Sequence, residues 1–330
     1  MISYPWFLFL SIDILSAAEV FLEERRWRFR RYSHYLKEKY GAPAYRVGVD
    51  CGFSCPNRKN GRESYGCSYC ESFGAAAIYQ DSLLSIKSQV ERATAFLRKR
   101  YGADIFLLYL QAFSNTYDTV ENLKRIYDYA LDLENFEELI ISTRPDCIDK
   151  NKAGLLASYM ERDLDVWVEL GLQSAHDKTL ERINRGHTKE DFDEAYGLLK
   201  KAGIKISVHL ILGLPGEDWR MIEETVRYVA SLRPDGIKLH NLHIPFNTPL
   251  YGEYAQGKVK PPDYGTYMEY VIKTLELLPC DTVIQRVVAD TPKERLAAPR
   301  DFGNKCTFID DLERKMAVID TFQGRKFFSL

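Results

Sequence analysis

The sequence predicts an α/β fold in which a parallel sheet is covered by helices. Between residues 45 and 244, short apolar runs of strand length alternate with longer amphipathic segments. The strand-like runs are continuously apolar, which is typical of parallel strands that are buried on both faces. The chain has 330 residues, of which 45% are hydrophobic and 28% charged. This composition and length suit an ordinary globular protein with a large core.

The predicted elements follow one another as strand and helix. Strands are expected at 45–49, 105–110, 139–142, 166–170, 206–211 and 236–244, and helices at 86–101, 119–133, 152–162, 190–202 and 219–231. Thr188 and Asp191 form a capping pair before one helix, and Gly203 ends it. This pattern fits an open sheet and an incomplete barrel equally. Both folds place functional groups at the carboxyl ends of the strands.

The two ends of the chain differ from this core. We expect a helical N-terminal extension (1–40), a core (41–250) and a smaller C-terminal extension (251–330) with a helix at 264–278 and a strand at 282–288. The apolar run at 4–20 contains Asp13 and Glu19, and no Lys or Arg precedes Arg25. It therefore matches neither a spanning helix nor a signal peptide. A docked N-terminal helix and a start codon assigned too early remain open, and we expect a cytoplasmic protein without a membrane partner.

The overall charge excludes bulk basicity as an argument for nucleic-acid binding. The chain has 45 Lys and Arg against 47 Asp and Glu, a formal net charge of −2. One local stretch, Arg-Arg-Trp-Arg-Phe-Arg-Arg-Tyr at 25–32, is basic with interleaved aromatic residues. Such a stretch can contact phosphates and stack on bases. The alternative is the solvated face of an N-terminal helix.

Four of the seven cysteines lie within twenty residues, at Cys51, Cys55, Cys67 and Cys70. A cluster of this kind in a reducing compartment is more typical of metal binding than of disulfides. Four thiolates suit a structural zinc ion. Three thiolates could instead hold an iron–sulfur cluster with one iron open to another ligand. The remaining cysteines, at 147, 280 and 306, are isolated, and we expect structural roles for them.

Polar motifs also follow the later strands. They are Glu-Leu-Gly-Leu-Gln-Ser at 169–174, Arg-Gly-His-Thr at 185–188, a segment from 209 to 217 that ends in Gly-Leu-Pro-Gly-Glu, and Lys-Leu-His-Asn-Leu-His at 238–243. Since His240 and His243 are three apart on a predicted strand, we expect them to point to opposite faces.

The order of these motifs behind a cysteine cluster resembles the radical S-adenosylmethionine (radical SAM) enzymes. The similarity is to the branch that includes the Elongator catalytic subunit and oxygen-independent coproporphyrinogen oxidase. Within that branch, the Cys-Pro-Asn-Arg run at 55–58 is similar to a bacterial YhcC-like group. The resemblance implies an α/β fold of the incomplete (β/α)6 TIM-like barrel type.

The resemblance also implies a cofactor set and its contacts. Cys55, Cys67 and Cys70 would hold a [4Fe–4S] cluster, and the amino and carboxylate groups of SAM would chelate the fourth iron. A small residue is usual where Cys51 stands, so Cys51 is expected to be a spare thiol, with a competing ligand as the alternative. The implied SAM contacts are Tyr69 beside the adenine, Gln111 in the segment that meets the amino group, Gln173, Arg185, and His209 in place of an acidic residue.

The implied reaction is reductive cleavage of SAM to a 5′-deoxyadenosyl radical that abstracts hydrogen from a substrate. An external one-electron donor of the flavodoxin or ferredoxin type is expected. A tRNA base is the leading substrate expectation. The alternatives are a small metabolite or cofactor precursor as the substrate, or a non-catalytic protein with a structural zinc site made by all four clustered cysteines.

Overall fold

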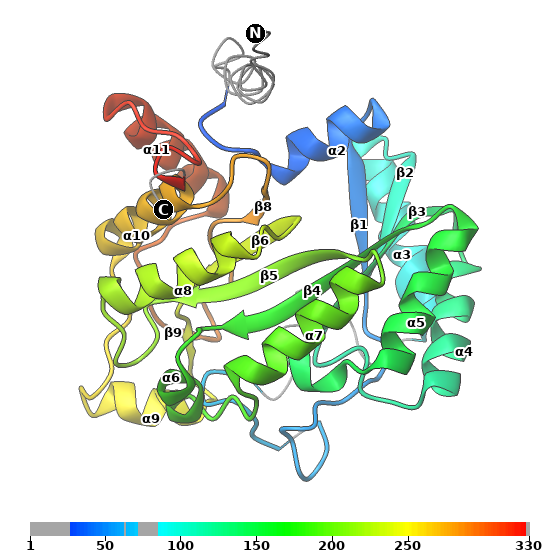
Figure 1. Ribbon diagram of the computed structural model, residues 1–330, viewed down its shortest axis with the longest axis horizontal. Helices are drawn as coiled ribbons and strands as arrows, with labels where there is room; N and C mark the ends of the chain where they lie inside the picture. Colours follow the sequence, from blue (N-terminus) through cyan, green and yellow to red (C-terminus); the bar gives the residue numbers. More distant parts are fainter. Residues whose placement is uncertain (1–26, 63, 72–84, 328–330) are drawn as a thin grey trace, which may run out of the picture.

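The computed structural model describes residues 27–62, 64–71 and 85–327. Its centre is a seven-stranded sheet with the order β1-β2-β3-β4-β5-β6-β8, in which all neighbouring strands are parallel. The strands are β1 (Ala44–Val49), β2 (Ile105–Leu110), β3 (Phe136–Thr143), β4 (Asp165–Gln173), β5 (Lys205–Leu212), β6 (Gly236–Asn241) and β8 (Val283–Arg286). The sheet curls into the expected incomplete barrel (Figure 1).

Helices connect successive strands and cover the outer face of the sheet (Figure 1). They are α3 (Ile86–Tyr101), α4 (Val120–Leu131), α5 (Lys150–Ser158), α6 (Asp177–Arg182), α7 (Lys189–Lys201) and α8 (Trp219–Ser231). Short 3₁₀ turns lie at Pro145–Cys147 and Tyr159–Arg162. The C-terminal part adds α9 (Pro249–Ala255), α10 (Tyr264–Leu277) and α11 (Lys305–Val318), with a two-stranded antiparallel sheet of β7 (Ile244–Pro245) and β9 (Leu296–Ala298).

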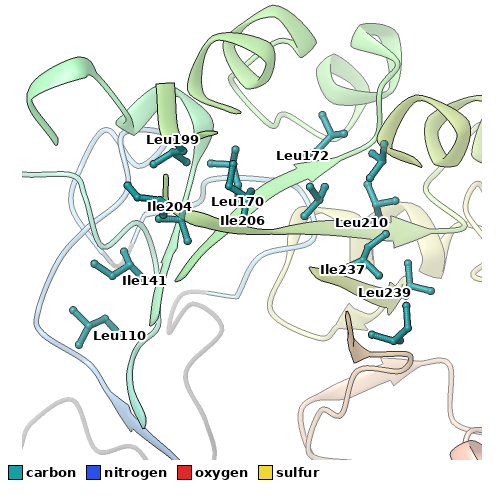
Figure 2. Close-up of a cluster of buried hydrophobic side chains, with 14 of the residues drawn as sticks. Leu110, Ile141, Leu170, Leu172, Leu199, Ile204, Ile206, Leu210, Ile237 and Leu239 are labelled. Atoms are coloured by element: carbon teal, nitrogen blue, oxygen red, sulfur yellow. The ribbon is translucent and has the colours of Figure 1, made fainter. Parts of the chain in front are cut away.

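The main core lies between the sheet and these helices. Because side chains alternate along a strand, every second residue faces this core, as Leu108 and Leu110 do on β2. Figure 2 shows the corresponding side chains of the central strands, among them Leu170, Ile206 and Leu239. Full burial of one such side chain contributes roughly 1.5–3 kcal/mol relative to its exposure.

The inner face of the sheet is closed at its amino-terminal end by α2 (Tyr32–Tyr40). Leu36 of this helix packs with Leu107, Ile140 and Trp167, which are the inward side chains of β2, β3 and β4. In Figure 1, α2 lies at the end of β1 opposite to the loop that follows this strand. The interior is therefore plugged at one end, which leaves the carboxyl ends of the strands as the position for a cavity.

Most expected elements are confirmed. The helices at 86–101 and 219–231 and the strand at 105–110 match the structure at both ends. The single strand expected at 236–244 is wrong: β6 ends at Asn241, and Ile244 belongs to the small antiparallel sheet. The strand expected in the C-terminal extension is β8, and it pairs with β6 in the main sheet. The division at residue 250 stays a prediction.

The basic stretch near the N-terminus is only partly described, since 1–26, with the apolar run at 4–20, lie outside the described residues. Residues 27–31 precede α2 and are not helical, so the interpretation as a helix face is wrong there. The backbone of Arg31 instead bridges to Ile284 on β8. Arg28 pairs with Asp320 at 3.0 Å and Arg31 with Glu313 at 2.7 Å. These arginines hold the segment against the C-terminal part of the chain.

No described helix has both the length and the apolarity to cross a bilayer.

Candidate active site

A cavity of about 560 Å³ lies at the carboxyl ends of the strands. Loops that follow parallel strands meet at the same edge of the sheet, so segments far apart in the sequence line this space together. The structure brings all eight predicted cluster and cofactor residues to its lining: Cys55, Cys67, Tyr69, Cys70, Gln111, Gln173, Arg185 and His209.

The structure places three of the four clustered cysteines at the cavity and the fourth elsewhere. Cys55, Cys67 and Cys70 line the cavity. Cys51 does not; its side chain packs against the main core, and burial raises the pKa of its thiol. A zinc site made of four cysteines needs all four sulfurs at about 2.3 Å from one ion. Because Cys51 lies outside the cavity that the other three cysteines line, the arrangement argues against a zinc site made by all four cysteines.

Asn57 and Arg58 organise the loop that carries these cysteines. Arg58 donates hydrogen bonds to the carbonyl oxygens of Arg62 at 2.6 Å and Ser64 at 2.5 Å, and its Nη2 lies 3.2 Å from Cys70 Sγ. The Asn57 amide donates to the carbonyl of Asn184 at 2.6 Å and lies 3.6 Å from Cys67 Sγ. The sequence showed both residues within the Cys-Pro-Asn-Arg run but not their contacts. Donors that face sulfur stabilise a thiolate, which is the form that ligates metal.

Nearby positive charge affects the pKa of the Cys67 thiol. Burial acts to raise the pKa of Cys67, but the charges of Arg185 and Arg144 and a hydrogen bond from Arg185 lower it below its ordinary value. Burial and the neighbouring Cys67 raise the pKa of Cys70 to about 11, against the effect of Arg58. Bound metal would favour the thiolate at all three positions. Cys67 is thus better prepared for ligation than Cys70 before any metal binds.

Arg185 and Gln173 are held together by close packing at Gly171. Arg185 donates to the Gly171 carbonyl at 2.9 Å and lies 3.6 Å from Cys67 Sγ. A Cβ at position 171 would stand 2.7 Å from both Arg185 Nη2 and Gln173 Nε2, so a larger residue would require both side-chain ends to shift. Gln173 has a φ of 74°, and its buried Oε1 has no hydrogen-bond partner among the described residues. A buried acceptor costs free energy unless it is paired. Its presence in the cavity fits a bound ligand with N–H or O–H groups, as SAM has.

The loop after β2 keeps a glycine-like backbone without glycine. Ala112 and Phe113, which follow Gln111, both have positive φ values of 71° and 59°. The loop is fixed by backbone hydrogen bonds from Gln111 to Val49 and from Ser114 to the cysteine loop. Left-handed backbone at non-glycine residues is uncommon and concentrates at functional sites. The segment thus adopts, without glycine, a backbone conformation of the kind that glycine favours.

Three histidines share the cavity: His209 on β5, His240 near the end of β6, and His243 just after β6. The rings of His209 and His240 lie 4.1 Å apart, and burial lowers the pKa of both well below the ordinary value. The expectation that His240 and His243 point to opposite faces is wrong, because both line the cavity. The strand ends at Asn241, so the alternation of a strand does not extend to His243. There, His243 Nδ1 lies 2.6 Å from Thr291 Oγ1.

Below the histidines lies a buried charged layer that connects the strands. Glu169 on β4 accepts hydrogen bonds from Arg46 at 2.8 Å and Tyr109 at 2.7 Å, and it forms an ion pair with Lys238 on β6. Burial acts to raise the pKa of Glu169, but Lys238 and Arg46 lower it to about 2. Burial, with the charges of Arg46 and Arg286, lowers the pKa of Lys238. The sequence placed Glu169 and Lys238 in motifs, but only the curled sheet shows that they pair.

Two sides of the cavity can be distinguished by their origin. We call the lining residues from 55–70 and 171–187 the cysteine wall. The lining residues from 240–305 form the C-terminal wall, which contains His240, His243, Arg286 and Lys305. Arg295 of the C-terminal wall pairs with Glu71, directly after the cysteine loop, at 2.8 Å.

Comparison with family models agrees with this geometry. The model of the radical SAM superfamily matches residues 60–229, and that of the radical SAM C-terminal domain matches residues 234–317. The chain belongs to the radical SAM superfamily. It is an enzyme of the radical SAM type, and membership implies cleavage of SAM with an iron–sulfur cluster.

Individual relatives place this radical SAM enzyme more narrowly. An uncharacterized protein of Methanocaldococcus jannaschii is 33% identical over 96% of this chain and 97% of its own length. Protein YhcC of Escherichia coli K12 is 32% identical over 84% of this chain and 89% of YhcC. The YhcC-like grouping is thereby confirmed. A tRNA uridine(34) acetyltransferase of M. jannaschii is 32% identical over 47% of this chain but only 28% of its own length.

A solved structure supports the fold. The Elp3 protein of the archaeon Methanocaldococcus infernus superposes with a TM-score of 0.62 at 20% identity, covering 74% of this chain and 62% of that structure.

Proposed function

We propose that this radical SAM enzyme holds a [4Fe–4S] cluster through Cys55, Cys67 and Cys70, cleaves SAM there, and abstracts hydrogen from a tRNA base. The observation that carries the cofactor assignment is the separation of the four cysteines: three line the cavity with the SAM candidates, and Cys51 packs in the core. When bound, the cluster supplies one electron to the sulfonium of SAM, which splits into methionine and a 5′-deoxyadenosyl radical. The electron comes from an external donor of the flavodoxin or ferredoxin type in the cytoplasm.

The residues of the chain prepare this chemistry in three ways. Asn57, Arg58 and Arg185 direct N–H donors at the sulfur atoms and so stabilise negative charge on the thiolates. Gln173 offers its unpaired Oε1 to the N–H or O–H groups of SAM, and Tyr69 supplies an aromatic surface for the adenine. The interior below is closed by α2, which keeps bulk water from entering at that end.

The tRNA substrate is supported by the partial similarity to a tRNA-modifying acetyltransferase. The nucleosides of tRNA from cells with and without the gene provide the test, by liquid chromatography and mass spectrometry. We expect one modified nucleoside to be lost and its precursor to accumulate. An unchanged nucleoside profile would contradict the tRNA proposal and leave the cofactor assignment standing.

A second candidate is a small metabolite or cofactor precursor as the substrate. One observation favours it: Arg28 and Arg31, part of the stretch expected to contact RNA, pair with Asp320 and Glu313 of the same chain. Consumption of SAM by the reduced enzyme in extracts separates the two candidates. Stimulation that survives removal of RNA by ribonuclease supports the small molecule, and stimulation that requires intact tRNA supports the first proposal.

A further inference from the structure

The charge of the cavity contrasts with that of the whole chain. The formal net charge is −2. Eight Lys and Arg side chains of the described residues line the cavity, against three carboxylates, Glu71, Glu169 and Asp290. Such an excess in a concave, partly buried space produces a positive potential that attracts anions.

Six of the eight cations have a specific partner. Arg46 and Lys238 pair with Glu169, and Arg295 pairs with Glu71. Arg144 pairs with Asp146 at 2.8 Å. The remaining two of this set, Arg58 and Arg185, point at the sulfur atoms of the cysteine wall. Their charges are therefore offset by carboxylates or by the thiolates that would hold the cluster.

Arg286 and Lys305 differ from the others. Neither forms an ion pair with a carboxylate in the described part of the chain, although both line the cavity. Arg286 Nη1 lies 2.6 Å from His240 Nε2, and that ring packs against His209. A neutral imidazole orients the guanidinium without neutralising it. Arg286 thus keeps donors and a full charge for another group.

The surroundings of Arg286 respond to this uncompensated charge. After burial, Arg286 is a cause of the lowered pKa of His243, which falls to about 4, and of the lowered pKa of Lys305. It also acts in the same direction on His240, behind burial and His209. The Cys306 thiol and Asp290 act on the pKa of Lys305 in the opposite direction. Repulsion between the two cations is unfavourable, and an oxyanion bound by both would offset it.

We propose that Arg286 and Lys305 form a subsite for an oxyanion of the substrate, a phosphate or a carboxylate, on the C-terminal wall. The planar guanidinium suits two oxygens of such a group, and the ammonium of Lys305 adds a point charge. This subsite rests on the proposed function, since it would anchor the substrate whose hydrogen is abstracted. For a tRNA substrate the oxyanion is a backbone phosphate; for a small metabolite it is a carboxylate or a phosphate ester.

The test is isothermal titration of the cluster-loaded enzyme with inorganic phosphate and, separately, with acetate. Saturating SAM is present throughout, so that its own carboxylate is already accommodated. We expect binding of at least one probe that weakens tenfold or more in Arg286→Gln and in Lys305→Gln. Lys315→Gln is the matched control, because Lys315 lies on the same helix as Lys305 and is exposed. Lys305 is at the start of α11, so its replacement leaves the core intact even if Arg286→Gln fails to fold.

Each outcome decides the matter. Stronger binding of phosphate indicates a phosphate-bearing substrate, and stronger binding of acetate indicates a carboxylate. No binding of either probe, or equal binding by wild type and both variants, would overturn the subsite. The nucleoside comparison is independent of this result: an unchanged tRNA profile with retained probe binding defeats the tRNA proposal and keeps the subsite.

Discussion

The two walls of the cavity differ in their electrostatics. The cysteine wall gathers thiols that must ionise, and it surrounds them with Asn57, Arg58 and Arg185, whose donors point at sulfur. The C-terminal wall contains histidines that burial keeps neutral, and two of its cations, Arg286 and Lys305, have no carboxylate partner among the described residues. Under the two proposals, one wall would ligate the metal cluster, whereas the other would bind a ligand that brings its own negative charge.

This difference indicates which wall would determine substrate specificity. The contacts of the cysteine wall come from two short segments, 55–70 and 171–187, and under the proposed assignment they would serve any radical SAM reaction. The C-terminal wall comes from the ends of β6 and β8, the loop after β8 and the start of α11. We therefore expect substitutions on the two walls to separate cofactor loading from substrate recognition.

The largest expected effect is the loss of the cluster on substitution within the cysteine wall. Cys55→Ala removes one of three proposed ligands, so iron content after anaerobic reconstitution should fall from about four per chain to near zero. Cleavage of SAM should become undetectable. Cys51→Ala is the matched control, because its side chain packs in the core beside the same loop. Iron loss in Cys51→Ala as large as in Cys55→Ala would refute the three-cysteine assignment.

The contrast between the walls also marks what the sequence could predict. The strands and their helices follow from local patterns of apolar runs and capping residues, whereas the roles of the cysteine wall were implied by the resemblance of its motifs to radical SAM enzymes. Gly171, Gln173 and Arg185 are also close in the sequence, so their contact depends only on β4 and the segment that follows it. All eight predicted site residues accordingly lie at one cavity.

The C-terminal wall could not be predicted in the same way, because its partners depend on tertiary pairing. β8 has four residues and joins the sheet by pairing with β6, which no local pattern reveals. That pairing brings Arg286 to His240, 46 positions away in the chain. The early end of β6 at Asn241 likewise depends on the turn into β7, and it changed the direction expected for His243.

A large effect on stability, independent of cofactor, is expected at the charged layer beneath both walls. Glu169→Gln leaves Lys238 and Arg46 buried without their carboxylate. Removing one partner of a buried ion pair costs about 3–5 kcal/mol. Urea denaturation of the cluster-free protein should show this loss in the free energy of unfolding. Glu223→Gln, which breaks a helical i,i+4 pair with Arg227, should cost about 0.5 kcal/mol or less. Equal losses in both variants would show that the layer does not behave as a buried pair.

An intermediate effect is expected at Gly171, where the cysteine wall is most tightly packed. A methyl group in Gly171→Ala would push Arg185 and Gln173 out of position, and such overpacking costs about 1–3 kcal/mol. Because the cysteines remain, iron should bind, while affinity for SAM should fall roughly tenfold, equivalent to about 1.4 kcal/mol. Titration with SAM measures the change. Gly197→Ala on α7 is the control, since nothing lies within 4 Å of its added Cβ. Unchanged affinity in Gly171→Ala would remove Arg185 and Gln173 from the SAM contacts.

The smallest expected effect is a pH dependence contributed by the C-terminal wall. Burial and Arg286 lower the pKa of His243 to about 4, whereas an unfolded histidine titrates near 6.5. Between these values the unfolded chain binds a proton that the folded chain does not. Stability should therefore fall as the pH drops from about 6.5 towards 4, by at most about 1.4 kcal/mol per pH unit from this residue. His243→Gln keeps a polar group opposite Thr291 and should make the decline of the unfolding midpoint shallower over this range. The same substitution should leave iron content unchanged, since His243 lies outside the cysteine wall. An identical pH profile in wild type and variant would mean that His243 has the same pKa in the folded and unfolded chain, and that neither burial nor Arg286 lowers it.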